Sequence, residues 1–531
     1  MTMRHVLLTD TLDGWARRTP DAPALLHKDR IIDYGEFARS VAAARDGLAA
    51  LGLRRDERVA IYLPKVPETV CAIFGTLAAA GVFVPVNPVL KPSQVGYILR
   101  DCNVRVLVTS TGRAAALAGE LGACPDLRDV VTVDGPTELP DHGPRALAWD
   151  ELCSATGTDA PSRIDTDMAA ILYTSGSTGR PKGVVLSHRN MVAGAESVAT
   201  YLENESSDRL LAVLPFSFDY GLSQITTAFA RGASVALIDY LLPRDVVTAV
   251  ERYRVTGLAA VPPLWNQIAH LEWPDAARRS LRYLTNSGGA MPLATTRALR
   301  TALPDTRIYL MYGLTEAFRS TYLPPEQVDL RPDSMGKAIP NAEIRIVRED
   351  GSECEPNEPG ELVHRGALVA LGYWNDPERT AARFRPAPGL PAELPHPESA
   401  VWSGDQVRRD AEGYLYFVGR KDEMIKSSGY RISPTEIEEV VYNHGGIGQA
   451  AALGVAHPIL GQAIVVVIQA HDDTVNEESI LAHCRGCLPP FIVPLAFRQR
   501  AELPRNAIGK IDPRALLDEL QDLFTGAQAE S

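Results

Sequence analysis

One stretch decides the fold of this chain: AAILYTSGSTGRPKG, residues 169–183. Its first five residues are apolar and predict a buried strand, and the following residues crowd hydroxyls, glycines and one lysine together. Glycines let backbone N–H groups approach phosphate oxygens, hydroxyls donate further hydrogen bonds, and lysine adds a mobile positive charge. The stretch therefore predicts a polyphosphate-binding loop formed by Thr174, Ser175, Gly176, Ser177, Thr178, Gly179 and Lys182.

This loop differs from the Walker A loop. The Walker A motif ends in Gly-Lys-Ser/Thr at the start of a helix, whereas Pro181 separates the last glycines from Lys182 here. A flexible Ser/Gly linker is the alternative, but a linker would not follow a buried strand directly. We therefore expect a phosphate-binding loop of another kind.

Strands and helices alternate on both sides of this loop. From residue 58 to about 308, runs such as RVAIYL alternate with stretches such as PETVCAIFGTLAAAG, which predicts βαβ units with parallel strands. After residue 335 the segments become short and turn-rich, which indicates a small antiparallel β subdomain. The pattern changes again near residue 420. An α/β fold is expected, with a large N-terminal domain at 1–420 and a small α+β C-terminal domain at 421–531.

Composition narrows the possible functions. The 531 residues carry 53 Lys+Arg against 66 Asp+Glu, a net charge of −13, which disfavours binding to nucleic acid or to an anionic membrane. The seven cysteines lack framework spacing, so a reducing compartment, the cytoplasm, is expected. Cys484 and Cys487 form a CxxC without two further ligands at zinc spacing, and we interpret them as core or surface thiols.

No signal peptide or membrane span is predicted. Asp10 and Asp13 interrupt the N-terminal segment where a signal peptide would be apolar. The uncharged segment 69–90 is long enough to span a bilayer, but glycines and prolines punctuate it. We expect a buried helix to about Ala80, a turn at Gly81 and a strand over 82–86.

The motifs occur in an order that resembles the adenylate-forming (ANL) superfamily of acyl-CoA synthetases, nonribosomal peptide adenylation domains and luciferases. The likeness covers nearly the whole chain. It rests on TSGSTGRPKG at 174–183, YGLTE at 312–316, GELVHRG at 360–366, SGD at 403–405, GRKDEMIKSSGYRISPTEIE at 419–438 and PRNAIGK at 504–510. It implies ATP and Mg²⁺ as cofactors, a small carboxylic acid as substrate, and a thiol acceptor.

Two of these motifs have a direct chemical reading. Attack of a carboxylate on the α-phosphate of ATP builds up charge, so catalysis depends on positioning and neutralisation. The resemblance makes Glu316 the magnesium ligand and Thr315 a donor to the α-phosphate; a helix-capping Thr-Glu pair is the alternative. Asp405 is expected to hold the ribose hydroxyls, with a β-turn aspartate as the alternative.

Other residues are assigned to the nucleotide by the same resemblance. Tyr312 is expected to stack on adenine. The segment Ser287-Gly288-Gly289-Ala290 is expected to line the nucleotide and carboxylate side, where its glycines allow close backbone approach. The remaining expected contacts are Gly288, Gly289, Ala290, Gly313, Arg420 and Arg431.

The resemblance also implies a moving C-terminal domain. Lys510, one of only eight lysines in the chain, is expected to bridge the substrate carboxylate and the α-phosphate, and with Lys182, Thr315 and Glu316 it completes the expected catalytic set. Asp422 occupies the place of the family hinge. Rotation there would withdraw Lys510 and bring Ser428 and Gly429 to the thiol channel.

The segment LPFSFDYG at 214–221 bears on the acid. Aligned with acyl-CoA ligases, Phe218 is the gate residue; aligned with amino-acid adenylation domains, Asp219 pairs with a substrate ammonium. A buried carboxylate without a partner is costly, which favours either a cationic acid that bears an amino or guanidino group or a hydrogen-bonding acid, unless Asp219 faces the backbone or a helix N-terminus. Arg319 is interpreted as a residue that helps to shape the acyl pocket or as a receptor for a second carboxylate, with ordinary surface charge as the alternative. The expected acyl pocket is Phe218, Asp219, Leu222, Trp265, Ser287, Leu314 and Phe318.

The acceptor is expected to be coenzyme A. YRISPTEIE at 430–438 looks like acyl-CoA ligases, and the segment from 311 to 344 resembles bacterial AMP-forming ligases of the exosortase-associated type and stand-alone ligases of natural-product clusters. Loading of an acyl group or amino acid onto the phosphopantetheine of a carrier protein stays open. More remote alternatives are a luciferase-like oxygenase and a noncatalytic nucleotide-binding paralogue, and Lys510 and Glu316 argue against the latter.

Overall fold

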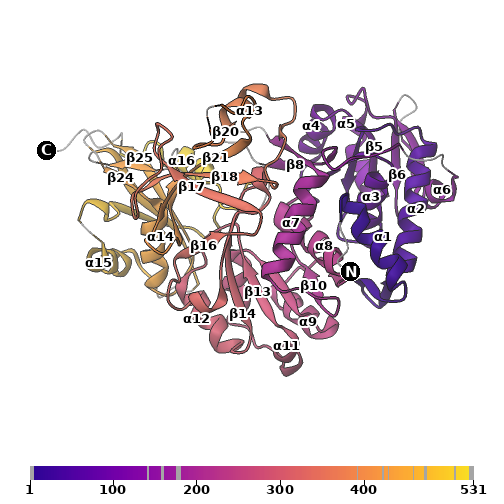
Figure 1. The fold of residues 1–531 in the computed structure, drawn as a ribbon. Helices are drawn as coiled ribbons and strands as arrows, with labels where there is room; N and C mark the ends of the chain where they lie inside the picture. Colours follow the sequence, from indigo (N-terminus) through magenta and orange to yellow (C-terminus); the bar gives the residue numbers. More distant parts are fainter. Residues whose placement is uncertain are drawn as a thin grey trace.

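The computed structural model describes residues 5–139, 143–156, 161–174, 181–391, 393–420, 424–427, 430–457, 460–471, 475–488, 490–506 and 510–524. In Figure 1 the N-terminal elements lie on the right and the C-terminal elements on the left, with β10, β13 and β14 between them. Strands pair into three sheets, and the expected α/β class, with a large and a small unit, is confirmed.

The first sheet carries the polyphosphate motif. Its strand order is β19-β9-β8-β4-β3-β5-β6-β7. The strands are β3 (Arg58–Tyr62), β4 (Val82–Pro85), β5 (Val104–Thr109), β6 (Asp129–Thr132), β7 (Arg145–Ala148), β8 (Met168–Thr174), β9 (Lys182–Ser187) and β19 (Gly372–Tyr373). The helices that accompany it are α2 (Tyr34–Ala50), α3 (Pro67–Ala78), α4 (Pro92–Asp101), α5 (Thr111–Leu121) and α6 (Trp149–Ser154).

The pairing of β8 with β9 corrects one prediction. Strands β3 to β8 pair in parallel as expected, but β8 and β9 are antiparallel, with Thr174 opposite Lys182. Parallel neighbours need a crossover of a dozen or more residues, and the segment between these two strands is too short for one. The phosphate-binding motif thus connects two adjacent strands.

The second sheet runs through the middle of the molecule, in the order β17-β18-β21-β22-β16-β15-β14-β13-β12-β10-β11-β1-β2 with β20 on β21. Its first strands are β1 (Pro23–His27), β2 (Arg30–Asp33), β10 (Arg209–Ala212), β11 (Ser234–Leu237), β12 (Gly257–Ala260), β13 (Tyr283–Asn286) and β14 (Arg307–Tyr312). The accompanying helices are α1 (Leu8–Arg18), α7 (His188–Tyr201), α8 (Asp219–Arg231), α9 (Pro243–Tyr253), α10 (Pro262–Ile268), α11 (Asp275–Ser280) and α12 (Leu293–Ala302).

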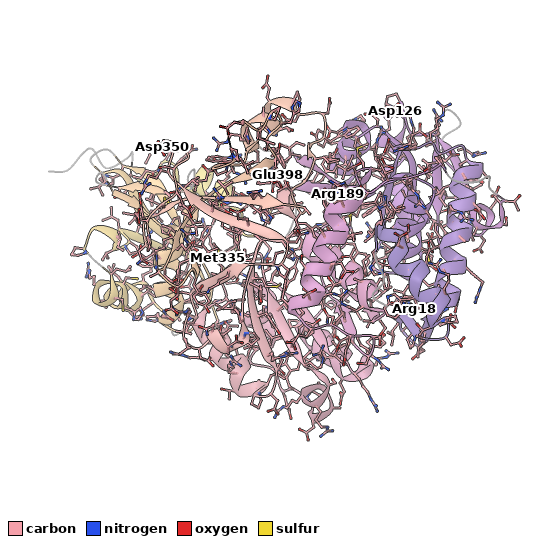
Figure 2. All side chains as sticks on the ribbon, in the orientation of Figure 1. Arg18, Asp126, Arg189, Met335, Asp350 and Glu398 are labelled. Atoms are coloured by element: carbon pink, nitrogen blue, oxygen red, sulfur yellow. The ribbon has the colours of Figure 1, made fainter. Side chains whose placement is uncertain are left out.

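The antiparallel part of this sheet begins earlier than predicted. We expected the change after residue 335, but β14 already pairs antiparallel with β15, because the chain turns back directly through η1 (Thr315–Ala317). Met335 lies beyond this point, on β16, near the middle of the view in Figure 2. The later elements are β15 (Thr321–Leu323), η2 (Pro325–Gln327), β16 (Ser334–Ala338), β17 (Ala342–Val347), β18 (Gly360–Gly366), α13 (Pro377–Arg383), β20 (Phe384–Pro386), β21 (Ser399–Arg409) and β22 (Leu415–Arg420).

The third sheet forms the small α+β unit. It contains β23 (Ile425–Ser427), β24 (Tyr430–Ile432), β25 (Ile447–His457), β26 (Gly461–Ala470) and β27 (Ala496–Gln499), with α14 (Pro434–Asn443), α15 (Glu477–Cys487), η3 (Pro490–Ile492) and α16 (Pro513–Leu520). Alternate residues of β26 enter two cores: Val466 packs with α14 and α15, and Val465 packs with α16. Both faces are therefore covered, as period-two alternation requires. The boundary between residues 420 and 421 stays a prediction.

The uncharged segment 69–90 forms the expected helix and strand. Helix α3 and strand β4 are buried, and a Cβ on Gly81 would lie 2.9 Å from Leu53 Cδ2. In the part of the chain that the structure describes, no helix combines the length and the apolar character that a bilayer crossing requires. Cys484 packs in the core of the small unit, and Cys487 is exposed.

Candidate active site

A lysine, a tyrosine and a glutamate meet where the first two sheets approach each other. Lys182 begins β9, and Tyr373 lies on β19, which pairs with β9. Lys182 Nζ lies 2.9 Å from Glu316 Oε1 and 2.7 Å from Tyr373 Oη, and Tyr373 Oη donates to the same Oε1 at 2.6 Å. The loop before Tyr373 fixes η1, since Ala370 N–H donates to Glu316 O at 2.8 Å. Sheet pairing thus brings residues far apart in sequence into one polar cluster.

The cluster holds its charges in a buried place. Burial raises the pKa of Glu316, but the nearby charges of Lys182 and Arg383 and the hydrogen bonds from Tyr373 and Lys182 outweigh that effect, so that the pKa falls to about 2. Burial lowers the pKa of Lys182, and Glu316 opposes that shift. Glu316 is therefore a carboxylate at neutral pH, which a hard cation requires.

A second polar group surrounds Asp405. Asp405 on β21 lies opposite Arg420 on β22, and Arg420 Nε is 3.2 Å from Asp405 Oδ1. Tyr312 Oη donates to Asp405 Oδ2. Burial raises the pKa of Asp405, whereas Arg420, Tyr312 and Arg383 lower it. Two of the predicted nucleotide contacts thus meet the aspartate predicted to hold the ribose.

The C-terminal unit places Lys510 beside the loop after β13. Gly288 has φ +82°, and a Cβ built there would lie 3.6 Å from Phe218 Cζ and 3.9 Å from Lys510 Cε. The backbone around Lys510 is held by Asn506, whose Oδ1 accepts from Lys510 N–H at 3.1 Å. The structure therefore brings Lys510 together with the two motifs predicted to face the acid.

Asp219 has an internal partner, which changes the expectation about the acid. Arg319 Nη1 lies 2.9 Å from Asp219 Oδ2, and both side chains are buried. Burial raises the pKa of Asp219 above its usual value, and the charges of Arg319 and Lys510 only partly oppose that rise. We had expected Asp219 to lack a partner and so to favour a substrate ammonium, and that premise is wrong. The expectation that Arg319 is ordinary surface charge is wrong as well, because Arg319 is 2% exposed.

The remaining predicted residues have different settings. Ser287 and Leu314 lie in the loops that follow β13 and β14, and Thr315 begins η1. Leu222, Trp265 and Phe318 are fully buried in hydrophobic cores, and the Trp265 indole N–H donates to Ala260 O at 3.0 Å and to Thr285 O at 3.2 Å. Their assignment to an acyl pocket stays a prediction.

Several predicted residues cannot be placed. Eight predicted site residues lie outside the described part of the chain: Ser175, Gly176, Ser177, Thr178, Gly179, Asp422, Ser428 and Gly429. Thr174 ends β8, and Arg431 lies on β24. Gly289 and Ala290 are exposed, and a Cβ on Gly313 would lie 3.3 Å from Arg319 Cα.

Tyr373 and Arg383 were missed in the sequence. Arg383 ends α13 and acts electrostatically on Glu316, Tyr373, Tyr312 and Asp405, so it lies between the two polar groups. Both residues belong to the segment GYWNDPERTAARF at 372–384. That segment shows no glycine-rich phosphate chemistry, and only the pairing of β19 with β9 reveals its position.

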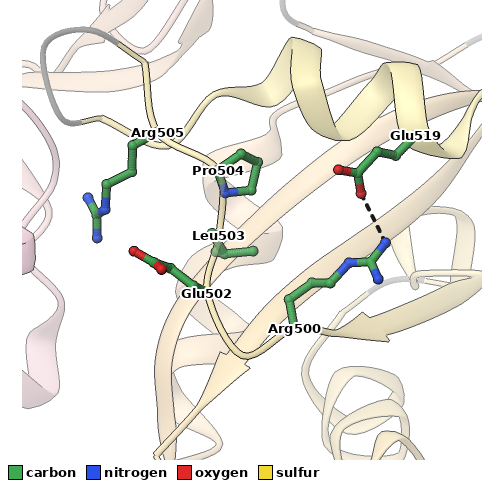
Figure 3. Close-up of a pocket in the computed structure, with 6 residues that line it drawn as sticks. All are labelled: Arg500, Glu502, Leu503, Pro504, Arg505 and Glu519. Carbon is green, nitrogen blue, oxygen red and sulfur yellow. Dashed lines mark hydrogen bonds and ion pairs between the residues drawn. The ribbon is translucent and has the colours of Figure 1, made fainter. Parts of the chain in front are cut away.

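A separate hollow of about 840 Å³ lies in the C-terminal unit (Figure 3). Arg505, Pro504 and Leu503 belong to the segment that leads toward Lys510, and Arg500 Nη2 lies 2.9 Å from Glu519 Oε2 across the hollow. None of its described lining residues belongs to the two polar groups above. The hollow is therefore separate from the candidate site.

Replacing Tyr373 by phenylalanine removes the hydroxyl that joins Lys182 to Glu316. We expect an increase in the KM for ATP and a decrease in kcat of about tenfold, because both charged groups lose an orienting hydrogen bond. Steady-state pyrophosphate release measures both constants. Tyr253→Phe is the matched control, since its hydroxyl donates to Lys28 O at the far edge of the second sheet. Equal effects of the two changes would contradict the assigned role.

His364 gives the protein a specific pH dependence. It lies on β18 with no exposed surface, and its Nδ1 is 2.9 Å from Ser320 Oγ. Burial lowers its pKa from 6.5 to about 3. Between these values the unfolded chain binds a proton that the folded protein does not, so the free energy of unfolding falls as the pH falls below 6.5.

We expect His364 to account for a loss of about 2 kcal/mol of folding stability between about pH 7 and pH 5. Urea denaturation of the wild type and His364→Asn at both pH values measures the difference, and the variant should lose most of this pH dependence. The exposed His396, replaced by asparagine, serves as the control. An unchanged dependence in His364→Asn would show that its pKa is not lowered.

This chain is similar to known proteins over most of its length. The AMP-binding enzyme family model matches residues 12–374, and the AMP-binding enzyme C-terminal domain model matches residues 436–510. A long-chain-fatty-acid–CoA ligase of Escherichia coli O157:H7 is 30% identical over 562 residues, covering 97% of this chain and 95% of that protein.

Solved structures share the fold. The anthranilate CoA ligase AuaEII in complex with anthranoyl-AMP superposes with a TM-score of 0.87 at 24% identity, covering 98% of each chain. The o-succinylbenzoate CoA synthetase MenE of Bacillus subtilis, in complex with ATP and magnesium ion, superposes with a TM-score of 0.81 at 25% identity, covering 96% of this chain and 99% of that one. The similarity therefore extends over both the large and the small unit.

Proposed function

Because this chain belongs to the AMP-binding enzyme family, we propose that it is an AMP-forming ligase that joins a carboxylic acid to the thiol of coenzyme A. The observation that carries the proposal is the position of Lys510. The C-terminal unit places this lysine beside Gly288 and within electrostatic reach of Asp219. Such a position supports formation of an acyl-adenylate.

In the first step an oxygen of the acid attacks the α-phosphorus of ATP. A new P–O bond forms, the bond to the β-phosphate oxygen breaks, and pyrophosphate leaves. Lys510 is suited to offset the charge of the acid and the α-phosphate, and Lys182 to offset the charge of the phosphates. Asp405 and Arg420 are suited to orient the ribose and the phosphate of the nucleotide.

The residues present fit a magnesium ion. Within the described part of the chain, Glu316 receives its hydrogen bonds on Oε1, which leaves Oε2 for a metal, and the carboxyl stays ionised down to about pH 2. Mg²⁺ bound there would neutralise phosphate charge. Lys182 and Tyr373 keep the carboxylate oriented toward the phosphates.

In the second step the thiol of coenzyme A attacks the carbonyl carbon of the acyl-adenylate. A C–S bond forms, the bond from that carbon to the AMP oxygen breaks, and AMP leaves with an oxygen that came from the acid. By family resemblance, rotation at Asp422 withdraws Lys510 before this step. The cytoplasm supplies ATP and coenzyme A, and the seven unpaired cysteines fit a reducing compartment.

Pyrophosphate release across a panel of fatty, aryl, amino and hydroxy acids tests the proposal. We expect release that depends on the acid, followed by acyl-CoA formation when coenzyme A is added. If an acid stimulates release but no acyl-CoA forms, and a phosphopantetheinylated carrier protein is acylated instead, then the acceptor is the carrier protein and not coenzyme A. Failure of every acid to stimulate release would contradict adenylation itself.

A further inference from the structure

The buried pair of Arg319 and Asp219 joins the start of α8 to the segment after η1, and both segments are predicted to line the acyl pocket. Arg319 follows Glu316 by three residues, and Asp219 begins α8 directly after Phe218. Their exposed fractions are 2% and 5%. Arg319 Nη1 makes one contact of 2.9 Å with Asp219 Oδ2 and one of 2.9 Å with Phe318 O. An ion pair buried in this way contributes little net stability, so stability alone does not explain it.

One edge of the Arg319 guanidinium is without a partner. Nε and Nη2 are buried, and neither has a hydrogen-bond partner among the described residues. The N–H groups of these two atoms point the same way and form the fork with which arginine binds an oxygen acceptor. The ring of Tyr220 covers the face of the group, with its centroid 4.7 Å from Cζ. A charged donor pair left unsatisfied in the interior is costly and calls for a ligand.

The backbone is strained where it presents this arginine. Phe318 has φ +55° and ψ −39°, and Arg319 N–H donates to Ala317 O at 2.6 Å, which makes a γ-turn with positive φ. A Cβ on Gly194 would lie 2.4 Å from Phe318 Cδ1, so the glycine makes room for the ring. Strain of this kind persists where the surrounding structure enforces it, and it is concentrated at ligand sites.

The balance of charge limits what the fork can bind. Asp219 offsets the charge of Arg319, and Lys510 lies where it can offset the reacting carboxylate. A second carboxylate or an ammonium on the acid would add a charge without a partner, and buried charge of that kind is disfavoured. A neutral oxygen acceptor adds none.

We propose that the Nε–Nη2 edge of Arg319 binds a neutral oxygen of the substrate, so that the enzyme activates hydroxy, oxo or alkoxy acids in preference to plain hydrocarbon acids. The inference rests on the proposed adenylation of a carboxylic acid. Arg319 is then the residue that sets specificity, and Asp219 positions it. A paired Asp219 would have no role in binding a substrate ammonium.

Pairs of acids that differ by one oxygen provide the test. Pyrophosphate release is measured for fatty and aryl acids with a hydroxyl, oxo or methoxy group at successive carbons, and for their unsubstituted parents. We expect at least one oxygenated acid to exceed its parent by about tenfold or more in kcat/KM. In Arg319→Met/Asp219→Asn the ratio should fall toward one. Arg319→Lys, which keeps the charge but not the fork, should lower it as well.

A matched control separates specificity from folding. Arg282 and Asp208 form another buried-carboxylate pair, with Nη2 and Oδ2 2.7 Å apart, away from the site. Arg282→Met/Asp208→Asn should leave the ratio unchanged. AMP binding by each variant verifies its folding, and if the double variant at 319 and 219 does not bind AMP, Arg319→Lys supplies the result.

Three results would overturn the inference: no preference for oxygen in the wild type, an unchanged ratio in the Arg319 variants, or dicarboxylic or amino acids as the best substrates. In each of these cases acids are still activated, so adenylation stands. Activation of no acid at all would instead refute the proposed function.

Discussion

Lys510→Ala is expected to reduce acid-dependent exchange of pyrophosphate into ATP by roughly 10²- to 10³-fold, the usual effect of removing a donor that stabilises transition-state charge. The structure supplies the reason, because Lys510 Cε would lie 3.9 Å from a Cβ on Gly288, and the charge of Lys510 partly opposes the rise that burial causes in the pKa of Asp219. Adenylation should therefore lose the cation that sits between the acid and the α-phosphate. Thioester formation from supplied acyl-adenylate should continue at a similar rate.

Lys337→Ala is the control for this change. Lys337 lies on β16, and its Nζ is 4.3 Å from the centroid of the Tyr414 ring. The Lys337→Ala substitution removes one positive charge, as Lys510→Ala does, but leaves the candidate site unaltered. Normal exchange in Lys510→Ala, or equal losses in both half-reactions, would contradict the assignment of Lys510 to adenylation.

Glu316→Gln is expected to lower the rate of adenylation by roughly 10²- to 10³-fold and to raise the Mg²⁺ concentration needed for half-maximal activity. Glu316 is ionised because Lys182, Arg383 and Tyr373 outweigh the effect of its burial. The amide carries no charge, so it neither attracts the metal nor balances Lys182. Pyrophosphate release at a series of Mg²⁺ concentrations measures both effects.

Glu326→Gln changes an exposed glutamate on η2 and should leave both quantities unaltered. A normal Mg²⁺ dependence in Glu316→Gln would remove Glu316 as the metal ligand. If the Mg²⁺ dependence of Glu316→Gln is normal but its adenylation rate is low, then the role of Glu316 is to orient Lys182.

Much of the fold could be predicted from local patterns. The buried strand before the phosphate-binding loop and the helix and strand within 69–90 follow from apolar periodicity and from glycine and proline positions. The antiparallel pairing of β8 with β9 could not be predicted in the same way, because the apolar run of β8 does not show whether the strand pairs in parallel or antiparallel with its neighbour. The length of the intervening loop was the usable signal.

The candidate site was predictable only where chemistry is concentrated in sequence. Lys182 and Glu316 lie in dense motifs, whereas Tyr373 reaches them through the pairing of β19 with β9. The Arg319–Asp219 contact joins residues 100 positions apart. Local sequence shows that each of these two residues is charged, but not that they neutralise each other. That contact removes the reason to expect a cationic acid and leaves the hydrogen-bonding acid as the favoured alternative.

Transfer of isotope from the acid to AMP tests the central claim most directly. An activated acid from the panel is labelled with ¹⁸O in its carboxylate and incubated with Mg²⁺, ATP and coenzyme A, and AMP is analysed by mass spectrometry. If the carboxylate attacks the α-phosphorus and the thiol then displaces AMP, AMP carries one ¹⁸O atom. Unlabelled AMP, or ADP as the nucleotide product, would contradict an acyl-adenylate intermediate.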